Sequence, residues 1–329
     1  MSVITVTQEN FNLEAEDVIV NKPSKKSQIV IGDLSTVREE LLKKENLTPQ
    51  MCREASNAFF MDHSGKKEKV RGIEDFRISA LDGFQIIIRK YIPTTKKGNF
   101  IVLYAHGGGW MQGNLETHDY LCRKIATSWG VEVFAVDYRL EPEYPFPIPL
   151  NDFFDSYKWC VETFPDKKIV IAGDSAGGNL CAALCVKIAK EKYKKMPYAQ
   201  VLIYPAISSD LGSSSFEAYG NLATLTKVST ANYTSQYIGK PYNDPSAVSN
   251  PYIYPLVCKD VSVFPKTILI PAECDVLLDS QLELEKRLKE AQIPIFRIHT
   301  KGTIHGFMMY GKEFEEEVSC VLEQAKSLL

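Results

Sequence analysis

A serine flanked by glycines is the first residue whose setting could do chemistry. The pentapeptide Gly173-Asp174-Ser175-Ala176-Gly177 has the form G-x-S-x-G, follows the apolar run KIVIAG and precedes the helical pattern GNLCAALCV. A sharp turn from a strand into a helix can present a serine as a nucleophile, and glycines leave room for its strained backbone. A serine at the start of a helix can also be a simple N-cap. The pentapeptide alone is compatible with both interpretations.

A second glycine-rich turn, HGGGW at 106–110, follows directly on the apolar run FIVLYA at 100–105. Residues without side chains at such a position let backbone N–H groups point at a developing oxyanion. A plain glycine turn is one alternative, and a phosphate-binding loop is another. The run has neither of the glycine patterns typical of phosphate-binding loops. Because the serine turn lies downstream, we interpret the run as an oxyanion hole.

Such a serine needs a histidine base held by a carboxylate, because its hydroxyl is a weak nucleophile near neutral pH. His305 lies in GTIHGF, just beyond an alternating apolar run, which predicts a loop at the carboxyl edge of the sheet, where ligands bind. His299 lies within that run and is predicted to be a strand residue. The other histidines lie in the N-terminal segment, in the glycine turn and at the start of a predicted helix: His63, His106 and His118.

Asp275 is the favoured carboxylate, because it follows the apolar run TILIPA and so also lies at the carboxyl end of a strand. Glu273 and Asp279 are its rivals, and Asp279 is equally explained as the cap of the next predicted helix. The chain order Ser175, Asp275, His305 is that of α/β-hydrolase triads, and it differs from the orders in chymotrypsin-like and subtilisin-like enzymes.

The elements that must position these residues alternate between strand and helix. The segment IEDFRISALDGFQIIIRKYIP predicts two antiparallel strands joined at Asp82 and Gly83. This alternation predicts an α/β fold, with right-handed crossovers and a mostly parallel twisted sheet flanked by helices. The predicted buried strands are 100–105, 131–138, 168–173, 199–205, 267–272 and 293–299. The predicted helices are about 115–129, 149–164, 178–195, 280–292 and 313–328.

Two segments stand outside this alternation and are predicted to form a helical cap. Residues 1–70 are polar and rich in Lys and Glu, and residues 206–263 are a long insertion rich in Ser, Tyr and Pro. Insertions of that length in compact domains are usually functional lids. The α/β core is then 71–205 with 264–329, in a single catalytic domain.

Two charged stretches are predicted to be helical. LSTVREELLKKENLT at 34–48 predicts an amphipathic helix opened by the capping pair Ser35 and Glu39. The basic run KIAKEKYKK at 187–195 could indicate a nucleic-acid patch. It lies at the predicted C-terminus of a helix, however, where cations complement the helix dipole, so we interpret it as a solvated face.

Composition argues against several other classes of protein. The 329 residues carry 41 acidic and 38 basic side chains, so neither nucleic acid nor an anionic membrane is indicated as a partner. No apolar run approaches the roughly 18 residues of a membrane span. The N-terminal MSVITVTQENFNLEAED lacks the pattern of a secretory signal, and the eight cysteines include no Cys-x-x-Cys pair. These features predict a soluble cytoplasmic protein, with free thiols and no metal site, that acts on a small molecule.

At this level of detail the chain resembles the hormone-sensitive-lipase-like branch of the α/β-hydrolase family. Four motifs carry the resemblance: HGGGW at 106–110, GDSAGG at 173–178, ECDVLLD at 273–279 and HGF at 305–307. Two further blocks extend it over about 75–329: VDYRLEPEYPFP at 136–147 and NPYIYPL at 250–256. The resemblance implies an α/β-hydrolase fold and a serine carboxylesterase. Such an enzyme would hydrolyse short-chain esters through an acyl-enzyme intermediate, without a metal or organic cofactor.

The resemblance also implies roles for individual residues. Ser175 is the expected nucleophile, His305 the general base and then acid, and Asp275 the group that orients the imidazole. The implied oxyanion hole is built from the glycine turn and the residue after the nucleophile: Gly107, which shapes the turn, and the N–H groups of Gly108, Gly109 and Ala176.

Aromatic residues near these motifs are candidates for binding substrate, although aromatic side chains more often belong to the core. Three of them adjoin the motifs or end a core strand: Trp110, Tyr204 and Phe307. Tyrosines of the insertion are weaker candidates for the inner face of a lid: Tyr219, Tyr233, Tyr237 and Tyr252.

Departures from the family pattern are few. Glu141 stands where alanine is usual, Tyr144 where histidine is frequent, and Val276 where proline often follows the acid. None of them removes a catalytic group, although Glu141 could alter local packing or the charge of the pocket.

Two alternatives to an esterase stay open. An amide hydrolase or N-acetyl deacetylase would use the same triad. A ligand-binding receptor on the same fold would have lost turnover, and the presence of both Ser175 and His305 argues against it. The protein is expected to be a monomer or a homodimer.

Overall fold

The computed structural model describes residues 21–222 and 224–329, so the N-terminal sequence MSVITVTQENFNLEAED, which lacks the pattern of a secretory signal, lies outside the described residues. Within them, eight strands form one sheet in the order β1-β2-β4-β3-β5-β6-β7-β8. β2 pairs antiparallel with β1 and β4, and the other neighbours are parallel. The strands are β1 (Gly72–Ser79), β2 (Gln85–Ile92), β3 (Phe100–Ala105), β4 (Glu132–Asp137), β5 (Lys168–Asp174), β6 (Ala199–Ile203), β7 (Lys266–Ile270) and β8 (Ile295–Arg297).

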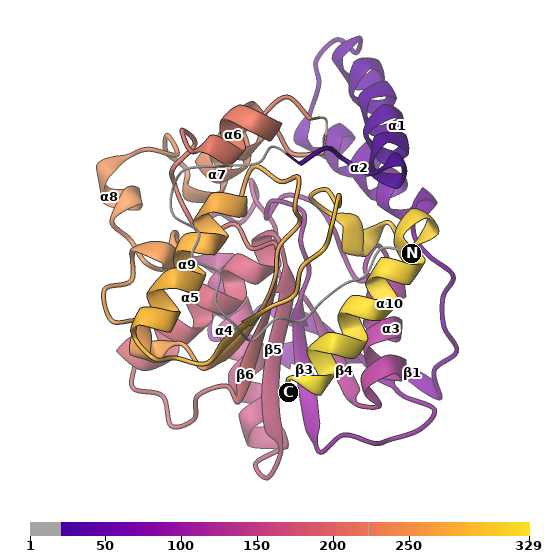
Figure 1. The fold of residues 1–329 in the computed structure, drawn as a ribbon. Coiled ribbons are helices and arrows are strands. Elements are labelled where there is room, and N and C mark those ends of the chain that lie inside the picture. Colours follow the sequence, from indigo (N-terminus) through magenta and orange to yellow (C-terminus); the bar gives the residue numbers. More distant parts are fainter. Residues whose placement is uncertain (1–20, 223) are drawn as a thin grey trace.

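The central strands form where apolar residues run without interruption. Every residue of β6, and all but the first of β3 and β5, are buried, as expected when helices cover both faces of a parallel sheet. One face packs against α3 (Asp119–Trp129) and α10 (Gly311–Ser327). The other packs against α4 (Ile148–Thr163), α5 (Ala176–Lys190) and α9 (Leu278–Glu290). The prediction of a mostly parallel sheet flanked by helices is confirmed (Figure 1).

The hairpin of β1 and β2 turns at Asp82 and Gly83, as predicted. Gly83 has a φ of 86°, a conformation that glycine adopts at no steric cost. The carboxylate of Asp82 accepts the N–H of Phe84. Local turn chemistry therefore accounts for the start of the sheet.

Helices from two distant parts of the chain lie together above the carboxyl ends of the parallel strands (Figure 1). The N-terminal part gives α1 (Lys25–Leu42) and α2 (Pro49–Asp62). The insertion gives α6 (Ser214–Tyr219), α7 (Lys227–Ile238) and α8 (Pro245–Val248), followed by the short 3-10 helices η1 (Pro255–Val257) and η2 (Val261–Val263). A third 3-10 helix, η3 (Phe307–Met309), precedes α10.

The boundaries predicted for the N-terminal helix, 34–48, are wrong. α1 is capped by Ser24, whose hydroxyl accepts the N–H of Ser27. Ser35 lies inside the helix, where its hydroxyl donates to the carbonyl oxygen of Ile31. A capping pair is a short sequence pattern, and serine inside a helix can also donate a hydrogen bond to a backbone carbonyl of the preceding turn. The pattern therefore did not locate the start of the helix.

Two further boundaries differ from the predictions. α5 ends at Lys190, and Lys192 has a φ of 52°, so most of the basic run at 187–195 lies beyond the helix. Closely spaced like charges disfavour continuing a helix. His299 lies past the end of β8 rather than within the strand.

All eight cysteines have free thiols. No helix in the described part of the chain combines the length and the apolar character needed to cross a bilayer.

Candidate active site

Ser175 lies at the sharp turn between β5 and α5. Its backbone has a φ of 52° and a ψ of −115°, a strained conformation of the kind found at functional turns. The residue occupies the N-cap position of α5, but its side chain makes no capping hydrogen bond. Its Oγ instead lies 2.9 Å from Nε2 of His305. A simple helix cap therefore does not account for this serine.

Gly173 and Gly177 let β5, α5 and β3 approach closely around this turn. A Cβ atom on Gly177 would overlap the carbonyl oxygen of Ala105, at the end of β3. One on Gly173 would overlap the backbone of Gly177. Backbone atoms in a close-packed interior cannot move aside as a flexible side chain can. Packing thus requires both glycines of the motif.

His305 bridges Ser175 and Asp275. Its Nε2 faces the serine hydroxyl, and its Nδ1 lies 2.7 Å from Oδ2 of Asp275. Asp275 is 1% exposed, so its bond to the imidazole is shielded from water. An isolated parallel bridge between Cys274 and Ile304 holds the two loops together. The imidazole is thereby placed to donate from Nδ1 and to accept a proton at Nε2.

The two rival acids have other partners. Glu273 accepts the N–H of Gly302, and Asp279 accepts the N–H of Ser215 at 2.8 Å. Asp279 lies in the first turn of α9, whose N-cap is Leu277, so the prediction of Asp279 as the cap is wrong. Glu273 thus holds a loop and Asp279 the first turn of α6, and neither carboxylate bonds to the histidine beside the serine.

The glycine turn presents unbonded N–H groups next to Ser175. Gly108 and Gly109 have φ values of 115° and 60°, which favour glycine. Their N–H groups, like that of Ala176, donate to no other residue in the parts of the chain that the structure describes. Ala176 begins α5, where helix N–H groups have no intrahelical partner. These three donors are available to an oxygen placed over the serine.

Gly107 differs from its neighbours because its N–H is already bonded. It donates to Oδ1 of Asp174 at 2.9 Å and is therefore not a free donor, as expected of the residue predicted to shape the turn. A Cβ atom at this position would overlap the carboxylate of Asp174, so the glycine shapes the turn. Asp174 also accepts the Tyr104 hydroxyl at 2.7 Å and pairs with His118 at 3.2 Å. Burial opposes ionisation of Asp174, but His118 and these hydrogen bonds outweigh it and lower its pKa.

Two further histidines have structural partners. The ring of His106 stacks on Tyr138 with centroids 4.3 Å apart, and the Tyr138 hydroxyl donates to the carbonyl oxygen of His106. Burial, together with the nearby His118, lowers the pKa of His106 to about 3, so the ring is neutral near neutral pH. His63 lies 3.0 Å from Glu313. Neither histidine is a candidate for the base.

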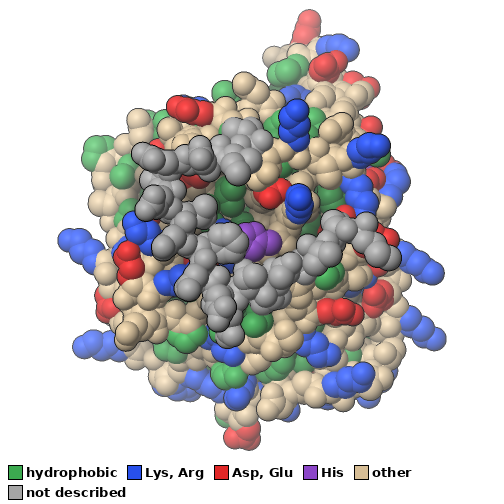
Figure 2. All heavy atoms as spheres, in the orientation of Figure 1, with side chains coloured by type: hydrophobic (Ala, Val, Ile, Leu, Met, Phe, Trp, Pro, Cys, Tyr) green, Lys and Arg blue, Asp and Glu red, His purple; other side chains and the backbone are tan. Residues whose placement is uncertain are grey.

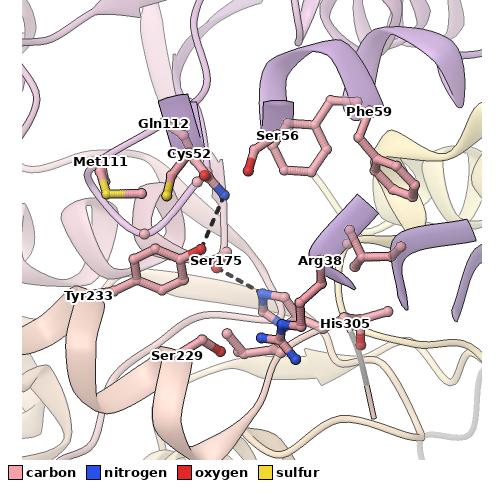
Figure 3. Close-up of a pocket in the computed structure, with 18 of the residues that line it drawn as sticks. Arg38, Cys52, Ser56, Phe59, Met111, Gln112, Ser175, Ser229, Tyr233 and His305 are labelled. Atoms are coloured by element: carbon pink, nitrogen blue, oxygen red, sulfur yellow. Dashed lines mark hydrogen bonds between the residues drawn. The ribbon is translucent and has the colours of Figure 1, made fainter. Parts of the chain in front are cut away.

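A cavity of about 460 Å³ lies over Ser175 and His305. Its walls come from α1, α2 and α7, and the ring of Tyr233 lies against Gly109 (Figure 3). The Tyr233 hydroxyl is 3.5 Å from Nε2 of Gln112. Much of the remaining wall is apolar: Leu34, Val37, Leu41, Leu42, Leu47, Phe59, Phe60 and Met309. Figure 2 shows one face of the molecule, on which acidic and basic side chains are interspersed.

Comparison with known proteins identifies the family of this fold. A family model described as alpha/beta hydrolase fold matches residues 102–309. The chain belongs to the alpha/beta hydrolase family. The resemblance and the fold class predicted from the sequence are thereby confirmed.

Individual relatives of this hydrolase are esterases. An ethyl acetate hydrolase of Pseudomonas putida is 30% identical over 261 residues, which span 77% of this chain and 81% of the relative. An arylesterase of Saccharolobus solfataricus is 34% identical over 248 residues, 74% of this chain and 79% of the relative. A solved arylesterase structure matches with a TM-score of 0.80 at 28% identity, covering 93% of this chain and 99% of that one. These relatives confirm the predicted enzyme class, a carboxylic ester hydrolase.

Of the three aromatic residues predicted to bind substrate in this hydrolase, Tyr204 alone lines the cavity. Its ring lies 4.9 Å from that of His305. Trp110 stacks on Tyr237 of α7 with centroids 4.3 Å apart, and Phe307 is fully buried beside Tyr204. The predictions for Trp110 and Phe307 are wrong, because closeness in sequence to a catalytic motif does not say which way a side chain points.

Several lining residues of this hydrolase were missed: Arg38, Cys52, Ser56, Met111 and Gln112. The signal for those on α1 was the spacing of residues 34, 37, 38 and 41, which share one helix face. Nothing in the sequence says that this face meets the insertion above the sheet.

No group of three or more His, Cys, Asp or Glu within 21–222 and 224–329 is arranged to hold a metal ion.

Glu141 of this hydrolase is fully buried beside the glycine turn. Its N–H donates to the carbonyl oxygen of Trp110, but neither carboxylate oxygen has a hydrogen-bond partner among the described residues. Arg53 donates to the backbone carbonyl of Glu141 and forms its ion pair with Glu143, at 2.7 Å. Burial raises the pKa of Glu141 from 4.5 to about 8, and Arg53 only partly opposes this. The carboxyl group is therefore protonated at neutral pH.

Glu141→Gln is expected to flatten the pH dependence of stability. Because the folded protein keeps a proton that the unfolded chain releases, the free energy of unfolding falls as pH rises between about 4.5 and about 8. Glutamine does not titrate, so the stability of the variant lacks this pH dependence. In calorimetry, the Tm of the variant minus the Tm of the wild type should therefore increase from pH 5 to pH 8.5. Arg53 lowers the pKa of Glu143 below 4.5, so Glu143 is ionised in both the folded and the unfolded chain over this range, and the control Glu143→Gln should show a Tm difference that hardly varies with pH. A Tm difference for Glu141→Gln that does not vary with pH would contradict this account.

Proposed function

We propose that this hydrolase is a serine carboxylesterase that cleaves short-chain carboxylic esters through an acyl-enzyme intermediate. One observation carries the proposal: the imidazole of His305 lies between Oγ of Ser175 and a buried carboxylate, under a cavity. Mutual hydrogen bonding of nucleophile, base and orienting acid is the geometry that activates a serine hydroxyl.

In the proposed first half-reaction, Oγ of Ser175 attacks the ester carbonyl carbon while Nε2 of His305 takes the hydroxyl proton. The carbonyl oxygen becomes an oxyanion that accepts hydrogen bonds from the N–H groups of Gly108, Gly109 and Ala176. Collapse of this intermediate breaks the bond to the alcohol oxygen, which leaves with the proton held by His305. Asp275 stays ionised and stabilises the imidazolium.

In the second half-reaction, water attacks the acyl carbon and gives a proton to His305. The second tetrahedral intermediate collapses, the proton returns to Oγ of Ser175, and the carboxylic acid leaves. The free enzyme is thereby restored without any other reactant.

We propose further that residues 1–70 and 206–263 act together as the cap of this active site. The walls of the cavity support this, because α1 and α2 come from the first segment and α7 from the second. Closing an apolar cap over the serine would exclude bulk water from the first half-reaction.

A substrate profile tests the proposed function. With 4-nitrophenyl esters, kcat/KM should be highest for acyl chains of about two to six carbons, because a cavity of this volume encloses only a small ligand. The measurement is release of 4-nitrophenol, with a matched 4-nitroanilide to compare ester with amide. Maximal kcat/KM beyond about ten carbons would refute the short-chain proposal. Faster cleavage of the anilide would favour the amidase alternative.

A further inference from the structure

Arg38 projects into the active-site cavity from α1 (Figure 3). It is half-buried, yet no carboxylate or carbonyl oxygen of the described residues accepts its guanidinium N–H groups. Every other arginine that is not exposed has an oxygen partner, by a hydrogen bond or, for Arg297, by an ion pair: Arg53, Arg89, Arg123, Arg139, Arg287 and Arg297. A guanidinium keeps its charge and offers five N–H donors in a planar fork. The donors of Arg38 are therefore available to a ligand in the cavity.

Arg38 also sets the charge of the cavity. Outside the proposed triad, the other ionisable Asp, Glu, Lys, Arg or His side chains among the described lining residues are His118 and Asp174, which pair with each other at the floor. Burial raises the pKa of the Tyr233 hydroxyl on α7, and the positive charge of Arg38 partly opposes this rise. Among the described lining residues, the cavity thus presents one cation that has no oppositely charged partner, within a largely apolar wall.

We propose that Arg38 selects esters whose acyl or alcohol part carries a carboxylate, so that the substrates of this enzyme are monoanionic esters such as half-esters of dicarboxylic acids. A carboxylate matches the guanidinium fork in geometry and charge, and charge-assisted pairs of this kind are strong in a partly desolvated site. Arg38 and Ser175 line the same cavity, so one small molecule can reach both. This inference rests on the proposed function, because it names the substrate class of the same site.

Two matched pairs of esters test the inference. Monoethyl adipate and ethyl hexanoate differ by a terminal carboxylate in place of methyl on the acyl side. 4-Acetoxybutanoate and butyl acetate differ in the same way on the alcohol side. Hydrolysis at pH 7.5 is followed by titration of the released acid. The wild-type enzyme should prefer the anionic member of at least one pair by about tenfold to a hundredfold in kcat/KM, and the pair that shows this assigns the carboxylate to the acyl or the alcohol side.

The ratio of anionic to neutral kcat/KM is the readout, because it cancels any common effect on folding or on the triad. Arg38→Gln should bring this ratio close to one. Arg38→Glu should favour ethyl 6-aminohexanoate, a cationic ester, over monoethyl adipate. The matched control is Lys44→Gln, which removes an exposed cation just beyond α1 that does not line the cavity and should keep the wild-type ratio.

Failure of this inference is distinguishable from failure of the proposed function. If wild-type enzyme hydrolyses the neutral esters but shows no anionic preference, or if Arg38→Gln keeps the preference, the role of Arg38 is overturned and the esterase stands. If no ester is hydrolysed, the proposed function fails. Calorimetric titration of adipate then still tests the anion site, because binding should weaken about tenfold or more in Arg38→Gln and an unchanged affinity would overturn it.

Discussion

Ser175→Ala should lower kcat/KM for 4-nitrophenyl butyrate by about ten thousandfold to a millionfold while the protein stays folded. The expected size reflects the loss of the covalent route, since removing the nucleophile of a triad leaves only the oxyanion hole and substrate binding to assist water. Alanine fits the turn without new contacts, because it removes one oxygen from a side chain that makes no helix-capping bond. Steady-state kinetics, with Tm measured on the same samples, makes the comparison.

Ser56→Ala is the matched control for this experiment. Ser56 also lines the cavity, but it comes from α2 and lies on the opposite wall from the imidazole (Figure 3). Its replacement should change kcat/KM by no more than a few-fold. If both alanine variants lost activity equally, the loss would reflect the shape of the cavity and not a nucleophile.

Asp275→Asn should lower kcat by about ten thousandfold with little change in KM for the same ester. Oδ1 of Asp275 accepts the N–H of Leu277 at 3.1 Å, so the asparagine oxygen would stay on that side. Its amide NH2 would then face Nδ1 of His305 and force the imidazole proton onto Nε2. In that tautomer, Nε2 cannot accept the proton of Ser175. Kinetics at saturating substrate tests this expectation.

Asp279→Asn provides the control, because Asp279 was a rival for the same role. Its carboxylate accepts the N–H of Ser215 in the first turn of α6, so its replacement should affect stability more than turnover. Near wild-type activity in Asp275→Asn, or a larger loss in Asp279→Asn, would contradict the assignment of the orienting acid.

Much of the fold was readable from the sequence, because buried parallel strands are short, continuous and apolar. FIVLYA is the whole of β3, and KIVIAG fills all but the last residue of β5. Strand ends also placed the reactive residues. Ser175, Asp275 and His305 each follow a strand in the parallel part of the sheet, and the carboxyl ends of such strands meet at one edge. Topology therefore brings together residues that are 130 positions apart.

The parts that were not predictable depend on contacts between distant segments. The glycine turn alone does not reveal that the Gly107 N–H donates to Asp174, at the end of β5. Trp110 was predicted to bind substrate because it adjoins the glycine turn, but its ring stacks on Tyr237 of α7, a contact that the sequence does not reveal. The position of Arg38 in the cavity was not predictable either. Sequence periodicity shows which residues share a helix face, but it does not show which other segment that face contacts.

The most direct test of the central claim is mass spectrometry of the intact protein after reaction with a fluorophosphonate, followed by peptide mapping. We predict one phosphonyl group per chain, attached to Oγ of Ser175, with ester turnover lost at the rate of labelling. Ser175→Ala should remain unlabelled. A folded, active wild-type protein that takes up no label on Ser175, or that is inactivated by label on another residue, would contradict the proposed nucleophile.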